Sequence, residues 1–175
     1  MYKHLLSVGG MTLLSRATGF LRDVLLGAIL GAGALADAFV VAFRLPNHFR
    51  AIFGEGAFNA AYVPTYSRAL EQEGAQAARG FADQVFTLLV ASQLALLLLA
   101  WLFMGSLVDL LAPGFRAHPE THALAVTLTR ITFPYLMFVT LVTLLSGTLN
   151  AHRKFAAAAA APILLNLAMI ATLAL

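Results

Sequence analysis

The sequence contains no cysteine and few charged residues. Of its 175 residues, 11% are charged and 61% are hydrophobic, and the mean hydropathy is +0.85. The absence of cysteine excludes a disulfide framework, a thiolate metal site and a cysteine nucleophile. Ordinary soluble domains carry about 25% charged residues, so this chain has too little polar surface for a soluble fold. The composition therefore predicts an integral membrane protein.

Recognisable catalytic and nucleotide-binding motifs are also missing. The sequence has no P-loop, no serine nucleophile elbow and no dinucleotide-binding fingerprint. Its formal net charge of +3 is too small to indicate a nucleic-acid surface. His118 and His122 flank Pro119 in a loop-like segment, unlike the helical zinc motif. We therefore expect no metal, no cofactor, no nucleic-acid partner and no enzyme activity.

Long uncharged stretches support the membrane class. Crossing a bilayer takes about 20 helical residues, and the stretches Gln84–Val108 and Ala156–Leu175 contain no charge. The expected fold is an all-α integral membrane protein with about five transmembrane helices and no soluble domain. The expected spans are residues 5–30, 35–64, 82–112, 122–149 and 156–175.

The basic residues of the connections predict an orientation. Cytoplasmic connections of membrane proteins carry an excess of lysine and arginine. The expected outer side carries only Arg116. The expected inner side carries Lys3, Arg68, Arg79, Arg153 and Lys154. We therefore expect a cytoplasmic N-terminus.

Five arginines fall inside the expected spans: Arg16, Arg22, Arg44, Arg50 and Arg130. On insertion scales an arginine at mid-membrane costs about 2.5–3.5 kcal/mol. Each one must therefore reach the interface, pair with an acid or face a polar interior. Reaching the interface suits Arg130 and Arg50, but it suits Arg16, near mid-span, poorly.

Helical periodicity gathers the polar residues of the first span on one stripe. The stripe contains Thr12, Ser15, Arg16, Gly19, Arg22 and Asp23. The opposite face is apolar and contains Leu13, Leu14, Ala17, Phe20, Leu21, Val24, Leu25 and Ala28. One interpretation is a network of ion pairs, in which Arg16 or Arg22 pairs with Asp23, and Arg44 with Asp37. The other, which we favour because arginines outnumber acids, is an anion-binding cavity.

The second span carries signs of an interrupted helix. Pro46 removes a backbone donor, and Gly54 and Gly56 flank Glu55. Transporters build binding sites from interrupted helices, although a simple packing kink explains the same pattern.

Blocks of sequence over nearly the whole chain resemble one known family. Residues Ser15–Asp23 and Asp37–Asn47 resemble the start of the MurJ (MviN) family of bacterial lipid II flippases. The resemblance continues through Phe53–Phe58, Tyr62–Pro64, Ala112–Phe115, Ile131–Tyr135 and Gly147–Phe155.

The resemblance implies a fold and a function. It places the chain in the superfamily of multidrug, oligosaccharidyl-lipid and polysaccharide exporters, as most of the N-terminal lobe of a two-lobe, fourteen-helix transporter. A last span that ends at Leu175 without a flanking charge agrees with such a fragment; a complete five-helix protein is the alternative. The implied function is alternating-access flipping of lipid II (undecaprenyl-diphosphate-linked disaccharide-pentapeptide) in the cytoplasmic (inner) membrane. The implied partners are lipid II, membrane lipids and the remaining helices.

The resemblance also implies the site residues. Family arginines that line a central cationic cavity match Arg16, Arg22 and Arg50, and the matching acids are Asp37 and Glu55. Ser15 and Asn47 complete the expected cavity with Arg44, which stands where relatives often have lysine. Three alternatives are another exporter of the superfamily, a membrane enzyme acting on lipid phosphates, and a non-transporting structural protein. We see no set of acids, base and nucleophile that favours the enzyme.

Overall fold

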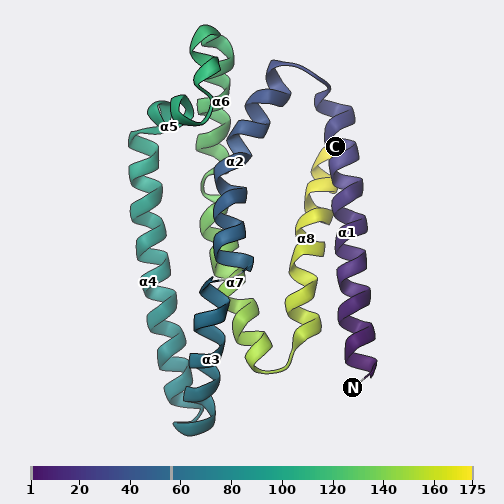
Figure 1. Cartoon of the computed structure of the whole chain (residues 1–175), viewed down its shortest axis with the longest axis vertical. Helices are drawn as coiled ribbons and strands as arrows, with labels where there is room; N and C mark the ends of the chain where they lie inside the picture. The colour runs from purple at the N-terminus through teal and green to yellow at the C-terminus, as the bar shows by residue number, and fades with distance from the viewer. Residues whose placement is uncertain (1, 56, 175) are drawn as a thin grey trace. The chain divides into compact units, whose positions relative to one another are not determined.

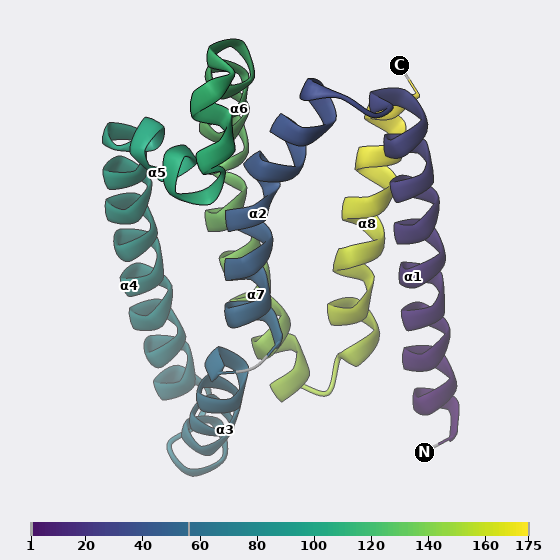
Figure 2. The same ribbon diagram turned by 45° about the horizontal axis from the view of Figure 1, so that its top comes forward.

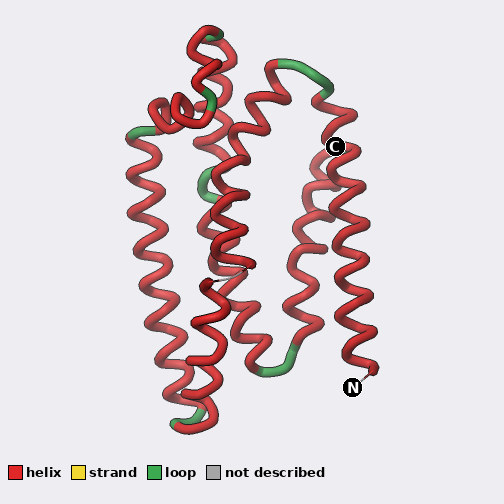
Figure 3. The backbone as a smooth tube through the Cα atoms, viewed as in Figure 1, coloured by secondary structure: helices red, strands yellow, loops and turns green. Residues whose placement is uncertain are grey.

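A computed structural model of the chain describes residues 2–55 and 57–174, and the side chains of residues 9–44, 46–48 and 58–174. The described residues form helices and no strand, and short loops connect them (Figures 1 and 3). Helices satisfy their backbone groups internally, as a lipid surrounding requires. The predicted all-α class is confirmed. The elements are α1 (Tyr2–Leu30), α2 (Ala34–Glu55), α3 (Ala57–Gln72), α4 (Ala75–Leu102), α5 (Met104–Leu111), the 3-10 helix η1 (Pro113–Ala117), α6 (Pro119–Thr132), α7 (Tyr135–Ala151) and α8 (Phe155–Leu173).

Within residues 2–55 and 57–174, three helical segments are long and apolar enough to cross a membrane. They are α4, the stretch Pro119–Ala151 that contains α6 and α7, and α8. The chain is therefore a multi-pass membrane protein. Helices α1 and α2, which carry the arginines of the expected site, are not among these three.

The helices differ from the expected spans in the middle of the chain. The expected span 35–64 is divided between α2 and α3, on either side of Gly56, which lies outside the described residues. The span 82–112 is interrupted at Phe103, where α4 gives way to α5. The span 122–149 is interrupted at Phe133 and Pro134, because Pro134 has no backbone N–H to donate to the carbonyl four residues earlier.

The connection expected over residues 68–80 is also mostly helical. Helix α3 continues to Gln72 and α4 begins at Ala75, so only a tight turn separates them. Gly74 has a φ of 92°, a left-handed conformation that glycine adopts without strain. Within the α3–α4 hairpin the buried ring of Tyr62 stacks on Phe58 and on Phe81, with ring centroids 5.4 and 5.8 Å apart.

The contacts divide the chain into two compact units. The first unit comprises residues 1–31 and 145–175, and the second comprises residues 32–144. In the first unit α1 and α8 lie side by side and run in the same direction (Figures 1 and 2). Side chains of the predicted apolar face of α1 are exposed, Leu13 to 69% and Phe20 to 72%. This face is available to lipid.

The second unit has its core where α2, α5 and α6 meet. Ala38 of α2, Val108 of α5 and Ala125 of α6 are completely buried against one another. Small side chains on α2 and α6 let the two backbones approach closely. A neighbouring cluster around Met104 and Leu136 joins α4 and α5 to α7.

Pro46 does not break its helix. Helix α2 runs through this buried proline to Glu55. A proline inside a helix leaves the carbonyl four residues earlier without its donor, and here that carbonyl belongs to Ala42. The hydroxyl of Thr132, on α6, donates to the Ala42 oxygen at 3.0 Å. A neighbouring helix thus supplies the missing hydrogen bond and keeps α2 continuous.

A buried polar contact joins α4 to α7 within the second unit. Gln93 is 6% exposed, and its Nε2 donates to Oγ1 of the completely buried Thr140 at 3.3 Å. The Thr140 hydroxyl in turn donates to the backbone oxygen of Leu136 at 2.8 Å. In an apolar bundle such a bond fixes which helices pair, because apolar contacts alone discriminate little against lipid.

Removing this contact should destabilise the fold by a measurable interaction energy. A double-mutant cycle of Gln93→Leu and Thr140→Val should give a coupling of about 0.6 kcal/mol, typical for interhelical hydrogen bonds in membrane proteins. The free energy of unfolding in mixed micelles is the measurement. Gln84→Leu, at an exposed glutamine of the same helix, is the control and should change stability little. Strictly additive effects of the two core substitutions would contradict the assigned bond.

Candidate functional site

The polar stripe of α1 lies partly against α8. Ser15, Gly19 and Arg22 are half-buried, whereas Arg16 and Asp23 are exposed. Residues 15 and 22 are seven apart, which places them almost in line along a helix. The predicted stripe is therefore present, and its line from Ser15 to Arg22 faces the neighbouring helix.

Arg22 is the most highly connected arginine that the structure describes. Its Nε and Nη2 donate to Oδ1 of Asp23 at 3.0 and 2.7 Å. Its Nη1 donates to Oδ1 of Asn166, on α8, at 3.0 Å. The Arg22 side chain is 27% exposed and that of Asp23 is 67% exposed. Of the two pairs that the ion-pair interpretation allowed for Asp23, the structure contains the pair with Arg22. A neutral amide binds the other side of the guanidinium.

Arg16, unlike Arg22, has no hydrogen-bonding partner among the residues that the structure describes. Its side chain is exposed, and no hydrogen bond or ion pair joins it to any other part of the chain that the structure describes. It stands six residues before Arg22, about 9 Å away along the helix axis. Helix α1 therefore presents one unpaired guanidinium and one that is partly paired.

The second unit contains the polar residues of α2. Asp37 and Asn47 are exposed and have no polar partner among the described side chains. The side chains of Arg50 and Glu55 lie outside the described residues, so the structure does not test their place in the site. The expected residues thus fall in two units, with Ser15, Arg16 and Arg22 in the first and Asp37, Arg44 and Asn47 in the second.

Arg44 does not pair with Asp37, so this pair of the alternative ion-pair interpretation is wrong. The Arg44 Nη1 instead donates to the backbone oxygen of Leu111, the last residue of α5, at 3.4 Å. The last carbonyls of a helix lack intrahelical donors and carry partial negative charge, which a guanidinium satisfies. Arg44 therefore caps α5, a role that the spacing along α2 could not indicate.

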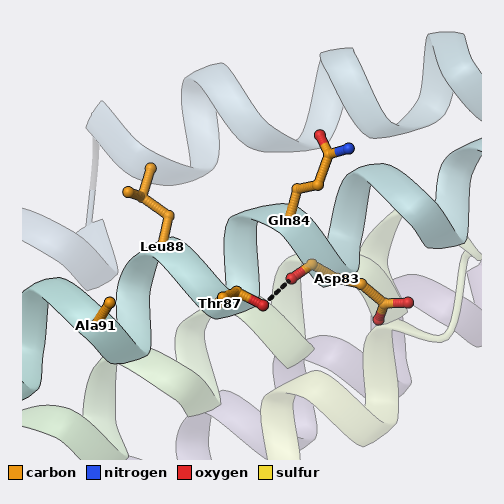
Figure 4. A pocket seen from close by; sticks show the side chains of 5 residues that line it. All are labelled: Asp83, Gln84, Thr87, Leu88 and Ala91. Carbon is orange, nitrogen blue, oxygen red and sulfur yellow. Dashed lines mark hydrogen bonds between the residues drawn. The ribbon is translucent and has the colours of Figure 1, made fainter.

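A hollow on α4 does not suit an anionic ligand. It has a volume of about 480 Å³ and is open to the outside, and its described lining comes from α4 alone (Figure 4). Asp83 gives it a negative charge, and Thr87 donates to the backbone oxygen of Asp83 at 2.8 Å. None of the expected site residues whose side chains the structure describes lines it.

A second charged cluster lies at the junction of α5, η1 and α6, in the second unit. Arg116 Nη2 donates to Oδ2 of Asp109 at 3.1 Å. His122 Nε2 lies 3.0 Å from the other carboxylate oxygen. The hydrogen bond and charge of Arg116, aided by His122, hold the pKa of Asp109 below its ordinary value although partial burial acts to raise it. Within the described residues, no group of three histidine or acidic side chains could hold a metal.

Reasoning from the sequence missed Asn166, Thr18 and Thr132. Asn166 is a single amide in a helix otherwise rich in alanine and leucine, and polar residues in apolar helices usually contact another helix. That signal could have identified it as a contact residue, but its partner could not have been read from the chain. Thr132 could have been suspected only once α6 was known to lie against Pro46.

Comparisons with known proteins identify relatives. The family model described as lipid II flippase MurJ matches residues 26–175. A probable lipid II flippase MurJ of Rhizobium tropici is 45% identical over 174 residues, which are 99% of this chain and 33% of that protein. The lipid II flippase MurJ of Burkholderia cenocepacia is 41% identical over 171 residues, which are 98% of this chain and 33% of that protein. The chain thus spans about a third of the length of these relatives.

The Asp109 cluster should make stability depend on pH. A carboxylate whose folded-state pKa is lowered stabilises the fold above about pH 4, and this contribution is lost as the pH falls through the lowered value. Thermal unfolding of wild type and Asp109→Asn in detergent should therefore differ at about pH 5, and the difference should shrink as the pH falls through the lowered pKa of Asp109. Salt should reduce the difference, because the Arg116 side chain is 67% exposed.

Asp83→Asn is the matched control, because the Asp83 carboxylate has no partner among the described side chains. A difference between wild type and Asp109→Asn that does not shrink as the pH is lowered from about 5 would contradict the assigned pair.

Proposed function

The chain belongs to the MurJ family of lipid II flippases, and we propose that it forms the first helices of a transporter that moves lipid II from the inner to the outer leaflet by alternating access. The proposal is supported by 45% identity over nearly the whole chain to a probable lipid II flippase. Because the chain spans a third of such relatives, the remaining helices would come from the rest of the transporter. Flipping breaks no covalent bond, so the proposed protein is not an enzyme.

The observation that carries the proposal is that both arginines of α1 keep hydrogen-bond donors without a partner among the described residues. Arg16 is exposed without a partner, and Arg22 keeps two of its five N–H groups free after three hydrogen bonds. An unpaired guanidinium on a membrane helix is energetically costly, so an arginine in that position usually serves a function. A diphosphate is the complementary ligand, because guanidinium groups bind its oxygens in pairs.

We assign the diphosphate contact to Arg16, Arg22 and Arg50, with Ser15, Asn47, Asp37 and Glu55 lining the same cavity. The acids would limit the positive field, so that the headgroup can leave as well as bind. Arg44 is left out of the contact, because it caps α5. In this mechanism the headgroup crosses the membrane in the cavity while the prenyl chain stays in lipid.

The proposed membrane is the bacterial cytoplasmic membrane, with the N-terminus inside. Arg153 and Lys154 separate α7 from α8, and Arg68 and Arg79 lie exposed in the α3–α4 hairpin. An excess of basic residues marks the cytoplasmic side. The orientation therefore places both of these connections in the cytoplasm and η1 outside.

Replacing the arginines by lysine should impair flipping although the charge is kept. In a complete transporter that carries this chain, Arg16→Lys or Arg22→Lys should slow flipping about tenfold, since loss of one charge-assisted hydrogen bond costs roughly 1.5 kcal/mol or more. The assay follows lipid II in sealed vesicles by cleavage with an impermeant enzyme added outside.

Arg130→Lys is the control, because Arg130 is an exposed arginine of α6 outside the proposed cavity. It should flip lipid II at the wild-type rate. Normal flipping by both cavity variants would refute the arginine–diphosphate contact.

A further inference from the structure

The side-chain amide of Asn166 forms hydrogen bonds with residues of α1. The residue is 6% exposed in the middle of α8. Its Nδ2 donates to the backbone oxygen of Ser15 at 3.1 Å and to Oγ1 of Thr18 at 3.3 Å. Its Oδ1 accepts the Nη1 hydrogen of Arg22 at 3.0 Å. Both N–H groups and the carbonyl oxygen of the amide therefore bond to one neighbouring helix.

The partners leave only one orientation for this amide. The Ser15 oxygen can only accept a hydrogen bond, and the Arg22 guanidinium can only donate one. The Thr18 hydroxyl lies 2.8 Å from the Leu14 oxygen and 3.0 Å from the Ser15 oxygen, and its single hydrogen is donated to these backbone acceptors. It must then accept from Asn166. The network fixes the amide nitrogen toward Ser15 and the amide oxygen toward Arg22.

A glycine makes room for the amide. A Cβ atom at Gly19 would lie 3.3 Å from Nδ2 of Asn166, closer than nine in ten real Cβ contacts. The helices can thus approach closely at Gly19, as small residues allow in membrane bundles. Gly19 belongs to the predicted polar stripe, so the notch (the close approach of α8 to α1 at Gly19) lies on that stripe.

The hydrogen bonds to Asp23 and Asn166 occupy three of the five N–H groups of Arg22. Asp23 and Asn166 together take one hydrogen from each of the three guanidinium nitrogens. The two remaining N–H groups are on the two terminal nitrogens, the donors that bind a pair of oxyanion oxygens. Asn166 is neutral, so it orients Arg22 without cancelling its positive charge.

We infer that Asn166 is a positioning residue for the anionic headgroup: through its amide oxygen it holds Arg22 in the orientation that receives a diphosphate. The inference rests on the proposed function, since it assigns a second residue to the same diphosphate contact. Prior orientation of a flexible arginine favours binding, because less freedom is lost when the ligand arrives.

The test is a double-mutant cycle on lipid II affinity in the complete transporter, measured by native mass spectrometry in detergent. Asn166→Leu, of similar size, should weaken binding about threefold to tenfold. In an Arg22→Gln background the same substitution should have no further effect, because its influence passes through Arg22. Thr172→Val, on the same helix, is the control, because its hydroxyl bonds only within α8 and affinity should be unchanged.

A purely packing role predicts a different result. Asn166→Leu would then leave affinity unchanged, or lower it equally with Arg22 present or absent, and either outcome overturns the inference. Thermal unfolding of each variant separates lost stability from lost affinity. If Arg22→Gln alone binds lipid II as wild type does, the proposed diphosphate contact of Arg22 itself fails; if it binds weakly but Asn166→Leu binds normally, only the positioning role fails.

If Asn166→Leu does not fold, Asn166→Asp provides a second test of the inference. It keeps an oxygen toward Arg22 but adds a negative charge that neutralises the guanidinium. It should weaken lipid II binding at least as much as Asn166→Leu. Wild-type affinity in this variant would overturn the inference.

Discussion

Polar groups in an apolar bundle must find partners inside the protein, because lipid supplies none. In the first unit this constraint brings Asn166 of α8 onto α1, where it meets Arg22. In the second unit it joins α4 to α7 through Gln93 and α6 to α2 through Thr132. Apolar side chains contact lipid almost as favourably as they contact one another. The polar contacts therefore decide which helices are neighbours.

The same constraint gives three arginines three different roles. Arg44 satisfies the end of α5, so its charge contributes to the fold. Arg22 is held by an acid and an amide and retains only part of its donors. Arg16 has no partner among the described side chains. Among these three arginines, the guanidinium groups that keep free donors therefore both lie on α1.

The sequence predicted some of these features and missed others for identifiable reasons. Helical spacing placed Ser15 and Arg22 on one polar stripe and left Arg16 or Arg22 as the partner of Asp23, because these are local properties of one helix. Spacing also suggested that Arg44 would pair with Asp37, and there it failed, since a carbonyl of another helix offers a better-placed acceptor. The interruption at Phe103 was missed because hydrophobicity continues through it without proline or glycine at that point.

Composition and periodicity by themselves determined that the chain is a helical membrane protein with a polar stripe on its first helix. They suffice for this because lipid selects for apolar helices, and 3.6-residue periodicity fixes which side chains share a face. Only the tertiary structure decided what the stripe meets. Arg22 and Asn166 are 144 residues apart in the chain, and no local rule connects them. The packing of α8 into the notch at Gly19 joins them and determines how much of the guanidinium stays free.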